Sequence, residues 1–479
     1  MIAFPDINWS ALLPLLLVSG SAILVLGAGL LTDDGEVLGW SAITGLVVTL
    51  MATATLIGQR IATFHHTFAL DGYAIFFDLL ILGAGVLVVL MSMSYLEESG
   101  IGAGEYYALV LFAIAGMMVM TSATDLIVLF LGLEIMSISV YVLAGAWRTE
   151  PRSNEASMKY FLLGAFATGF LLYGIALVYG ATGATRLDLI AAKVAMPIDR
   201  PMLLAGVAML LVAFGFKVAA VPFHMWAPDV YEGAPTPVTA LMAVAVKSAA
   251  FAAFGRVFLQ AIAGLQADWS VPLWVLAVAT MTVGNVLALA QRNIKRMLAY
   301  SSIAHAGYIL VALTAGGAAG GAAVLFYLFA YAFMNLGAFG VVIALGRRGE
   351  PHENIDDYAG LGFRSPLLGV AMAVFMLSLT GIPPLAGFAG KFYVFTAALR
   401  EGYVALAVIG VLNSVVSAGY YVRVLVTMFM TPGTPEVVRP GSRPYLFTSI
   451  VVSAVVTVLV GVFPALWMQL ARLSFLSLL

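Results

Sequence analysis

The sequence predicts an all-α polytopic membrane protein with about fourteen transmembrane helices, and three observations support that prediction. Hydrophobic residues make up 62% of the 479 residues and charged residues only 10%, which leaves too few polar side chains to cover a soluble domain. Apolar runs of about 20 residues, the length that crosses a bilayer core of about 30 Å, recur along the chain. Runs such as FLLGAFATGFLLYGIALVYG lack the alternation that a transmembrane barrel strand requires.

Each long apolar run is predicted to be one span. The fourteen predicted spans are residues 11–31, 38–58, 73–94, 106–122, 124–147, 157–180, 202–222, 236–260, 272–291, 297–316, 322–346, 366–396, 403–430 and 445–470. Almost nothing separates the fourth span from the fifth. The polar stretch 346–366 is interpreted as a solvated connector between spans rather than a catalytic segment.

Basic residues in the loops predict how the chain is oriented. One set of loops holds Arg148, Arg152, Arg292, Lys295, Arg296, Arg347, Arg348, Arg364, Arg439 and Arg443. The other set holds only Arg60, Arg186, Lys193, Arg200 and Arg400. Because cytoplasmic loops are enriched in lysine and arginine, the richer set is predicted to be cytoplasmic. With fourteen spans, both termini then lie on the outer side of the membrane.

Several classes of function are excluded by residues that the chain lacks. It has no cysteine, so disulfides, thiolate-held iron–sulfur clusters and CxxC redox sites are excluded. No GxGxxG loop follows a strand and no phosphate-binding loop occurs, so the chain is expected neither to carry electrons nor to hydrolyse nucleotides. The net charge of −2 gives no electrostatic reason to expect nucleic-acid binding.

Lysine is rare in this chain, yet most of its lysines fall within or beside the predicted spans. Lys193 and Lys295 are assigned to loops, whereas the other four accompany apolar runs: Lys159, Lys217, Lys247 and Lys391. A charged residue at the bilayer centre costs about 2.5–3.5 kcal/mol on insertion scales, so we interpret these lysines as functional. Lys159 lies two residues into its predicted helix, where its long stem can also reach the membrane interface, and that alternative stays open.

One acidic residue, Glu134, lies near the middle of the apolar run DLIVLFLGLEIMSISVYVLAGAW. Desolvation would keep an unpaired carboxylate there protonated, whereas a neighbouring cation would keep it ionised. Lys217 is the partner that we propose for it. Asp125 opens the same run and is better interpreted as a helix N-cap. Asp78, near one end of the third span, is not assigned a role.

Two histidines fall in or near the membrane. His305 lies within a span, in MLAYSSIAHAGYIL. It can be interpreted as a satisfied core residue, but an imidazole that titrates close to neutral pH also suits a proton carrier. His224 lies in PFHMWAPD, which is interpreted as an interrupted or re-entrant segment. No second histidine, cysteine or acid stands at zinc-ligand spacing from it, so no metal site is predicted.

Two stretches, residues 221–238 and 380–391, are predicted to interrupt helices within the membrane. Five prolines in them, which remove backbone hydrogen bonds, are assigned to the breaks: Pro222, Pro228, Pro235, Pro383 and Pro384. Such interruptions persist only where they are buried in protein or line a water-filled cavity. Broken helices in corresponding positions of two halves indicate the ion path of a transporter.

The spacing of titratable residues also indicates two halves. Glu134 and Lys217 are 83 residues apart, and His305 and Lys391 are 86 residues apart. Each pair joins a titratable residue in the fifth or tenth span to a lysine beside a broken seventh or twelfth span. Because the offset between the halves is five spans, an odd number, the halves must be inverted relative to each other in the membrane.

Three long stretches of the chain resemble a known family. KVAAVPFHMWAPDVYEGAPTPV, QRNIKRMLAYSSIAHAGY and LTGIPPLAGFAGKFYVF are similar to the antiporter-like subunits of respiratory complex I, the proton-pumping NADH:quinone oxidoreductase. The resemblance covers nearly the whole chain and is greatest to bacterial subunit N, the counterpart of mitochondrial NADH dehydrogenase subunit two. The chain is too short for the long lateral helix of subunit L, and Lys391 stands where subunit M has a glutamate.

The resemblance implies a division of the fourteen helices. N-terminal helices one to three are expected over about 1–105, and two inverted five-helix repeats over about 106–260 and 272–430. The last helix is expected over about 445–470. The resemblance also implies that certain residues match the essential charged positions of the family. These are Glu134, Lys217, Lys247 and Lys391, with Lys159 and His305 as further members.

The implied function is proton translocation across the bacterial inner membrane by one subunit of a larger enzyme. We expect a central axis in the order Glu134, Lys217, Lys247, His305 and Lys391. Proximity of Glu134 would hold the proton on Lys217 and separation would release it, with quinone reduction elsewhere in the complex biasing that equilibrium. Flavin, iron–sulfur clusters and quinone are expected in other subunits and no cofactor in this chain. Its expected partners are the other membrane subunits, including the related antiporter-like ones, and the lipid bilayer.

Two other functions stay open at this point. An Mrp-type cation/proton antiporter would have the same fold, although the stretches similar to subunit N argue against it. A purely structural membrane spacer would tolerate neutral replacements at the four lysines, and the insertion cost of those lysines argues against that. Aromatic residues, at 11% of the chain, give no support for quinone binding because those at helix ends usually anchor a membrane protein at the interface.

Overall fold

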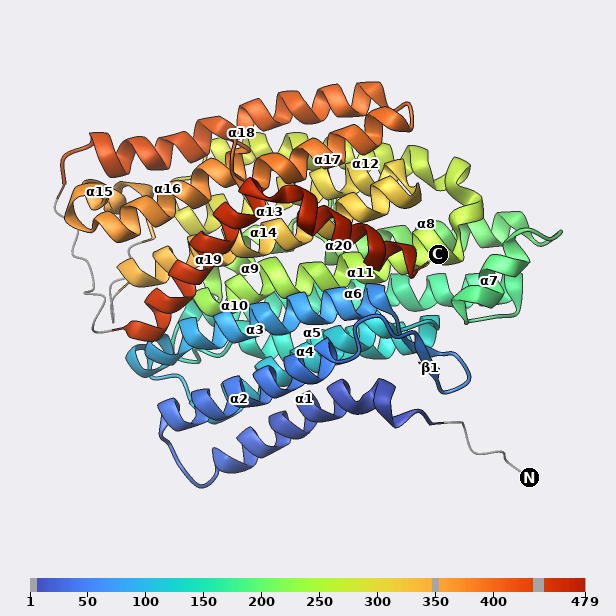
Figure 1. The fold of residues 1–479 in the computed structure, drawn as a ribbon, viewed down its shortest axis with the longest axis horizontal. Coiled ribbons are helices and arrows are strands. Elements are labelled where there is room, and N and C mark those ends of the chain that lie inside the picture. Colours follow the sequence, from blue (N-terminus) through green and yellow to red (C-terminus); the bar gives the residue numbers. More distant parts are fainter. Residues whose placement is uncertain (1–6, 347–352, 434–442, 479) are drawn as a thin grey trace.

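The computed structural model describes residues 7–346, 353–433 and 443–478 of the chain. Apart from one small hairpin, the regular structure of these residues is helical, and the long helices lie side by side in one bundle (Figure 1). Three of the basic residues that predict the orientation, Arg347, Arg348 and Arg439, lie outside the described residues.

Thirteen helices within the described residues are long and apolar enough to cross a membrane. They are α1 (Trp9–Ala28), α2 (Gly35–Ala54), α3 (Gly72–Ser99), α4 (Ala103–Ser122), α5 (Leu126–Ala144), α6 (Pro151–Thr182), α8 (Arg200–Lys217), the composite helices Thr236–Ala261 and Ala263–Leu289, α13 (Ile294–Ala315), α14 (Gly317–Leu345), α18 (Val404–Met430) and α19 (Pro444–Val462). Two shorter helices, α16 (Pro366–Thr380) and α17 (Ala386–Arg400), take the place of the twelfth predicted span. The prediction of about fourteen membrane-crossing elements is therefore confirmed.

The first composite helix is the most deeply buried span. It consists of α10 (Thr236–Leu241), the π-helix η1 (Met242–Val246), α11 (Lys247–Arg256) and the π-helix η2 (Val257–Ala261). Every residue of its apolar window is buried inside the bundle. The second composite helix joins a short 3₁₀ turn, η3 (Ala263–Leu265), to α12 (Gln266–Leu289).

Some elements differ from the prediction. Strands β1 (Ile61–Thr63) and β2 (Phe68–Leu70) form an antiparallel hairpin between α2 and α3, with Ile61 opposite Leu70. The predicted last span, 445–470, divides into α19 and α20 (Pro464–Leu476), because Pro464 lacks the amide that would continue α19 and instead occupies the first turn of a new helix. The remaining short helices are α7 (Leu187–Val194), α9 (Trp226–Gly233), η4 (Ile355–Tyr358) and α15 (Leu361–Arg364).

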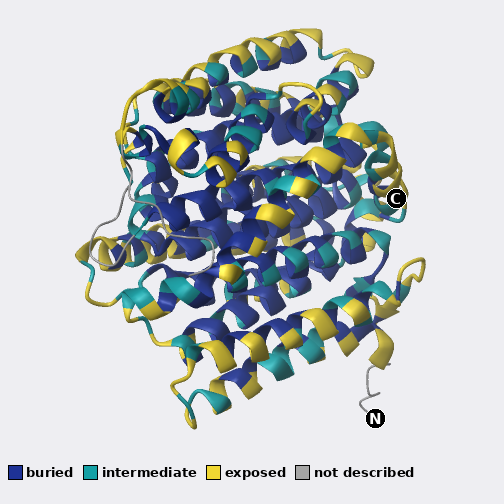
Figure 2. Ribbon diagram, turned by 60° about the vertical axis from the view of Figure 1, so that its left-hand side comes forward, coloured by how far each residue is buried: buried dark blue, intermediate teal, exposed yellow. Residues whose placement is uncertain are grey.

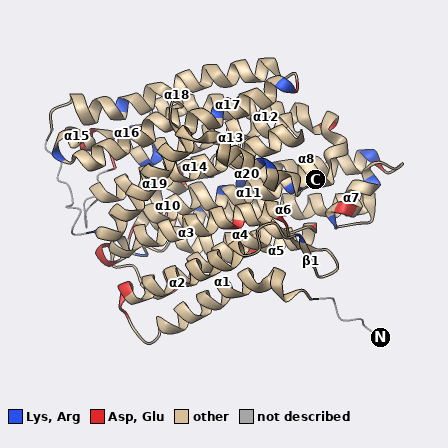
Figure 3. Cartoon of the chain, in the orientation of Figure 1, with Lys and Arg blue, Asp and Glu red and all other residues tan. Residues whose placement is uncertain are grey.

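Burial and charge follow the pattern of a membrane bundle. The outer helices, such as α1, α2 and α18, expose large apolar side chains, whereas the centre of the bundle is buried (Figure 2). Most acidic and basic residues gather at the two ends of the helices, and few lie between them (Figure 3). Exposed leucines and valines on the periphery therefore face lipid, and a charged residue in the middle of the bundle is an exception that requires explanation.

Close backbone contacts at two glycines set the positions of α5 and α13. A Cβ on Gly116 of α4 would lie 2.8 Å from the carbonyl oxygen of Gly132 on α5, which is closer than real Cβ contacts. In the same way, a Cβ on Gly284 of α12 would lie 2.7 Å from the backbone nitrogen of Ala304 on α13. Backbone packing at these points holds α5 and α13 close to their neighbours, and these are the helices that carry Glu134 and His305.

Candidate functional site

Lys217 is the last residue of α8, directly before the helix breaks, and is 4% exposed. Its ammonium group donates a hydrogen bond of 2.7 Å to Ser137 Oγ and a longer one of 3.4 Å to the hydroxyl of Tyr141. Both partners lie on α5. The ammonium also lies 5.5 Å from the ring centroid of Tyr141 and 5.9 Å from that of Tyr160, within the range of cation–π attraction.

Glu134 lies one turn before Ser137 on α5 and is partly exposed. Its carboxylate accepts a hydrogen bond of 2.7 Å from Thr168 Oγ1 on α6. Among the described residues, no acidic group lies within 4.0 Å of the Lys217 ammonium. Glu134 and Lys217 are therefore not paired directly, and Ser137 is the hydrogen-bond partner of the Lys217 ammonium on α5.

The first helix break follows Lys217 and is held by two side-chain contacts. Residues 218–225 are irregular, and Ala219 has a positive φ of 59°. The indole nitrogen of Trp226 donates to the carbonyl of Phe216, and the backbone nitrogen of Val221 donates to Thr280 Oγ1, both at 3.0 Å. These bonds satisfy backbone groups that the break leaves without helical partners.

The predicted prolines lie at different places relative to the breaks. Pro222 is within the irregular segment, Pro228 is in the first turn of α9, and Pro235 is the N-cap of α10. Pro383 and Pro384 both lie between α16 and α17. The two predicted interruptions are thus present.

The break segment also contains His224, which is half-buried. No group of three or more histidine, cysteine, aspartate or glutamate side chains that could hold a metal ion occurs in the described part of the chain.

Lys247 is the first residue of α11, directly after the π-helix η1, and is 2% exposed. Its ammonium group donates to the carbonyl oxygen of Ser302 at 2.7 Å and also contacts the hydroxyl of the same serine. Ser302 belongs to α13. Lys247 therefore connects the buried composite helix directly to α13.

His305 lies one turn beyond Ser302 on α13 and is 1% exposed. Its Nδ1 lies 2.8 Å from the hydroxyl of Tyr327 on α14, and its Nε2 lies 3.0 Å from the hydroxyl of Tyr421 on α18. The Tyr421 hydroxyl also hydrogen-bonds to that of Ser301. Because a neutral imidazole has one donor and one acceptor nitrogen, the ring links two hydroxyl groups from different helices and can pass a proton between them.

Lys391 lies in the second turn of α17, after the second break, and is 4% exposed. Its ammonium group donates to the carbonyl of Thr380 and to Ser414 Oγ, both at 2.8 Å, and to the carbonyl of Leu379 at 3.1 Å. The two carbonyls are the last of α16, where the helix dipole favours a cation. The ammonium also lies 4.8 Å from the ring centroid of Tyr308 on α13.

One helix, α13, thus contacts two of the buried lysines, Lys247 and Lys391. Ser302 binds Lys247, His305 follows one turn later, and the ring of Tyr308 lies against Lys391. The structure brings Lys247, His305 and Lys391 together around this helix. Lys217 and Glu134 lie next to α5.

Lys159 is not brought to this group. Its side chain is 41% exposed and pairs with Glu155 at 2.7 Å and with Asp229 at 2.8 Å. Asp229 also pairs with Arg296 at 2.7 Å. Partial burial raises the pKa of Asp229, but hydrogen bonds from Lys159 and Arg296 outweigh it and hold that pKa below its usual value. This position agrees with the interfacial alternative for Lys159.

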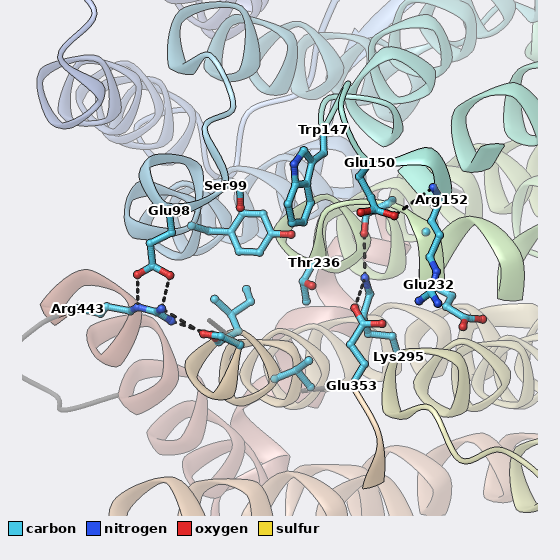
Figure 4. Close-up of a pocket in the computed structure, with 16 residues that line it drawn as sticks. Glu98, Ser99, Trp147, Glu150, Arg152, Glu232, Thr236, Lys295, Glu353 and Arg443 are labelled. Atoms are coloured by element: carbon cyan, nitrogen blue, oxygen red, sulfur yellow. Dashed lines mark hydrogen bonds and ion pairs between the residues drawn. The ribbon is translucent and has the colours of Figure 1, made fainter. Parts of the chain in front are cut away.

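A cavity of about 370 Å³ opens at the end of the bundle where α3 and α14 finish and α10 and α13 begin (Figure 4). Arg443 forms an ion pair with Glu98 on one side of it, and Lys295 forms an ion pair of 3.1 Å with Glu353 on another. Lys295 also donates to the carbonyl of Ala234 at 2.9 Å.

Sequence reasoning missed several of these residues. It assigned Lys295 to a loop, but this lysine lies in the first turn of α13 and is only 3% exposed. It also did not single out Ser302, Tyr327 or Tyr421, which bind the titratable groups. Buried hydroxyl groups inside apolar spans are a signal that could have identified them, because each requires a partner there.

Known proteins match this chain along most of its length. The family model described as NADH:quinone oxidoreductase/Mrp antiporter, transmembrane, matches residues 123–417. The NADH-quinone oxidoreductase subunit N of Trichlorobacter lovleyi is 50% identical over 473 residues, which cover 98% of this chain and 97% of that protein.

Solved structures show the same likeness. A chain of respiratory complex I from Thermus thermophilus, 36% identical, matches with a TM-score of 0.82 over 96% of this chain and 99% of that one. A chain of the Mrp complex from Dietzia shares the fold, with a TM-score of 0.87 and 22% identity over 98% of each chain. This chain belongs to the family of antiporter-like membrane subunits of NADH:quinone oxidoreductase, in its subunit N branch.

Proposed function

We propose that this chain is a proton-translocating subunit of NADH:quinone oxidoreductase in the bacterial inner membrane. One observation supports the proposal above the others: α13 carries a hydrogen-bond partner of Lys247, a buried histidine and an aromatic contact of Lys391 within two turns. Two ammonium groups and an imidazole held inside an apolar bundle are costly. A function that moves protons between them explains why they are there.

The axis proceeds from Glu134 through Lys217 and Lys247 to His305 and Lys391. Hydroxyl groups next to each member, such as those of Ser137 and Ser302, both donate and accept hydrogen bonds. They can therefore relay a proton, and bound water completes the path where no side chain does. Movement of Glu134 from Thr168 toward Lys217 would stabilise the ammonium form, and the return movement would release the proton.

The cavity beside Glu98 and Lys295 is the mouth of this path on the cytoplasmic side. It is lined by residues of the arginine-rich set, including Arg152 and Arg443. By the same reasoning, both chain termini lie on the outer side. The two broken helices belong to two inverted repeats, over about 106–260 and 272–430, which supports an axis that crosses the middle of the membrane.

The energy for translocation comes from quinone reduction in other subunits, which hold the flavin and the iron–sulfur clusters. Coupling requires only that the redox state of the complex change the relative free energy of the two Glu134 positions. The partners of this chain are the neighbouring membrane subunits, including the related antiporter-like ones.

The test is proton pumping per electron by the assembled complex with Lys217→Ala or Lys247→Ala. We expect both variants to assemble and to pump fewer protons, because each loses a titratable member of the axis. Wild-type pumping in both variants would refute the proposal and favour a structural spacer. Sodium or potassium flux by the purified chain alone would favour the cation antiporter, whose fold this chain shares.

A further inference from the structure

A second buried cluster of charged residues lies outside the proposed axis. Arg256, the last residue of α11, has no exposed side-chain surface. Its Nη2 donates a hydrogen bond of 2.8 Å to Asp71, the N-cap of α3, and its Nε donates to the carbonyl of Thr121 on α4. The guanidinium carbon lies 5.0 Å from the ring centroid of Tyr73. Three helices therefore meet at one arginine.

Asp78 belongs to the same cluster. It lies seven residues after Asp71 on α3, so two turns separate them on one helix face, and it is 1% exposed. Its Oδ1 lies 2.5 Å from Thr121 Oγ1, and that hydroxyl also lies 2.8 Å from the carbonyl oxygen of Met118. A hydroxyl has only one hydrogen and a carbonyl has none. An ionised Asp78 and the Met118 carbonyl must share the one hydrogen that Thr121 donates. A protonated Asp78 would instead donate to Thr121 and leave the hydrogen of Thr121 for Met118, so both contacts would then be complete hydrogen bonds.

The charges of the cluster agree with a protonated Asp78. Asp71 already balances Arg256, and a second carboxylate would leave one negative charge uncompensated in a site closed to water. Within the described part of the chain, the charged and titratable groups that act on Asp78 or share its cluster are Asp71 before α3, Tyr73 on α3 and Arg256 on α11, and α4 contributes the hydroxyl of Thr121.

The cluster also contains a counter-ion for the deprotonated acid. Arg256 Nη1 is buried and has no hydrogen-bond partner among the described residues. When the Asp78 O–H bond breaks, its electron pair stays on the carboxylate and the proton leaves. The positive charge of Arg256 then acts on that carboxylate as an attractive charge. The site can therefore hold or release one proton while Asp71 remains paired.

The position of the cluster relates it to proton movement. Asp78 lies near the start of α3, whereas Glu98, at the end of the same helix, lines the cavity. At 1.5 Å per residue these two carboxyl groups are separated by about 30 Å along the helix. Lys247 and Arg256 lie at the two ends of α11. We propose that Asp78 is a proton-binding site that exchanges its proton during turnover, toward the face of the membrane opposite the cavity.

This inference rests on the proposed function, and the decisive variant is Asp78→Asn in the assembled complex. An asparagine amide donates to Thr121 as the protonated acid does, so we expect normal assembly and normal NADH-driven quinone reduction, with fewer protons pumped per electron. Asp71→Asn is the matched control. It removes the counter-ion of Arg256, so we expect less assembled complex with Asp71→Asn than with Asp78→Asn.

Infrared spectroscopy tests the protonation state separately. The wild-type minus Asp78→Asn spectrum should contain the C=O band of a protonated carboxylic acid, shifted in heavy water. Absence of that band, wild-type pumping by Asp78→Asn, or failure of Asp78→Asn to assemble overturns the inference. If Lys247→Ala loses pumping while Asp78→Asn keeps it, only the inference fails. If Asp78→Asn, Lys217→Ala and Lys247→Ala all pump normally, the proposed function fails as well.

Discussion

His305 offers a way to separate hydrogen bonding from proton transfer within the axis. In a His305→Phe variant the aromatic ring is kept and both ring nitrogens are lost. Tyr421 retains Ser301 as a hydrogen-bond partner. The hydroxyl of Tyr327 loses the one partner that it has in the described part of the chain. The variant therefore leaves one buried hydroxyl group unsatisfied.

The loss of stability in His305→Phe follows from this one unsatisfied hydroxyl group. An unsatisfied buried polar group costs about 1–3 kcal/mol, so His305→Phe should destabilise the subunit by about that amount. A second substitution, Tyr327→Phe, removes the unsatisfied hydroxyl. The double variant should recover most of the lost stability and differ from the wild type by about 1 kcal/mol or less, because replacing both partners by apolar groups is nearly neutral.

Function should not recover in the same way. The His305→Phe/Tyr327→Phe complex lacks the imidazole that links α14 to α18, so we expect it to assemble and reduce quinone but to pump fewer protons per electron. The assays are thermal unfolding of the purified complex and proton uptake or release in proteoliposomes. Wild-type pumping in the double variant would show that His305 is a packing residue and would refute the reasoning.

Three further predictions follow from other contacts. Ser302→Ala removes a hydrogen bond to the buried ammonium group of Lys247, worth about 1.5–3 kcal/mol, and should reduce proton pumping. The control is Ser248→Ala, which removes a bond to the carbonyl of Val244 in the same composite helix and should leave pumping unchanged. Gly116→Ala should cost about 1–3 kcal/mol by overpacking α4 against α5 and lower the thermal stability, while Gly169→Ala, which meets no atom within 4 Å, should not lower it. Lys159→Ala removes partly exposed ion pairs worth about 0–1 kcal/mol, so pumping should stay near the wild-type level, and a loss as large as that of Lys217→Ala would contradict its placement outside the axis.

The sequence was sufficient to predict which elements exist and which lysines are buried. Hydropathy acts along the chain, so a run of about 20 apolar residues predicts a span wherever the span packs. Local hydropathy also predicts that Lys217, Lys247 and Lys391 are buried, and they are only 2–4% exposed. Their position inside apolar runs follows from local sequence, whereas their roles as proton carriers stay predictions.

Contacts between distant segments could not be predicted. Glu134 and Ser137 are one turn apart on α5, and the rotation of that helix decides which of them reaches Lys217. Lys295 was assigned to a loop, and its burial depends on Glu353 folding back over it from 58 residues away. Arg256 was not singled out because its acidic partner lies 185 residues earlier in the chain.

The complete burial of the helix that carries Lys247 also has a consequence for how the chain enters the membrane. During synthesis, the acidic partner of Arg256 is made before that arginine, so their ion pair can form as soon as the helix leaves the ribosome and reaches the bilayer. Lys247 has no such advantage, because Ser302 is made 55 residues later. This helix must therefore remain beside the insertion machinery, or be held by α3 and α4, until α13 has been synthesised, since an isolated lysine in lipid costs about 2.5–3.5 kcal/mol.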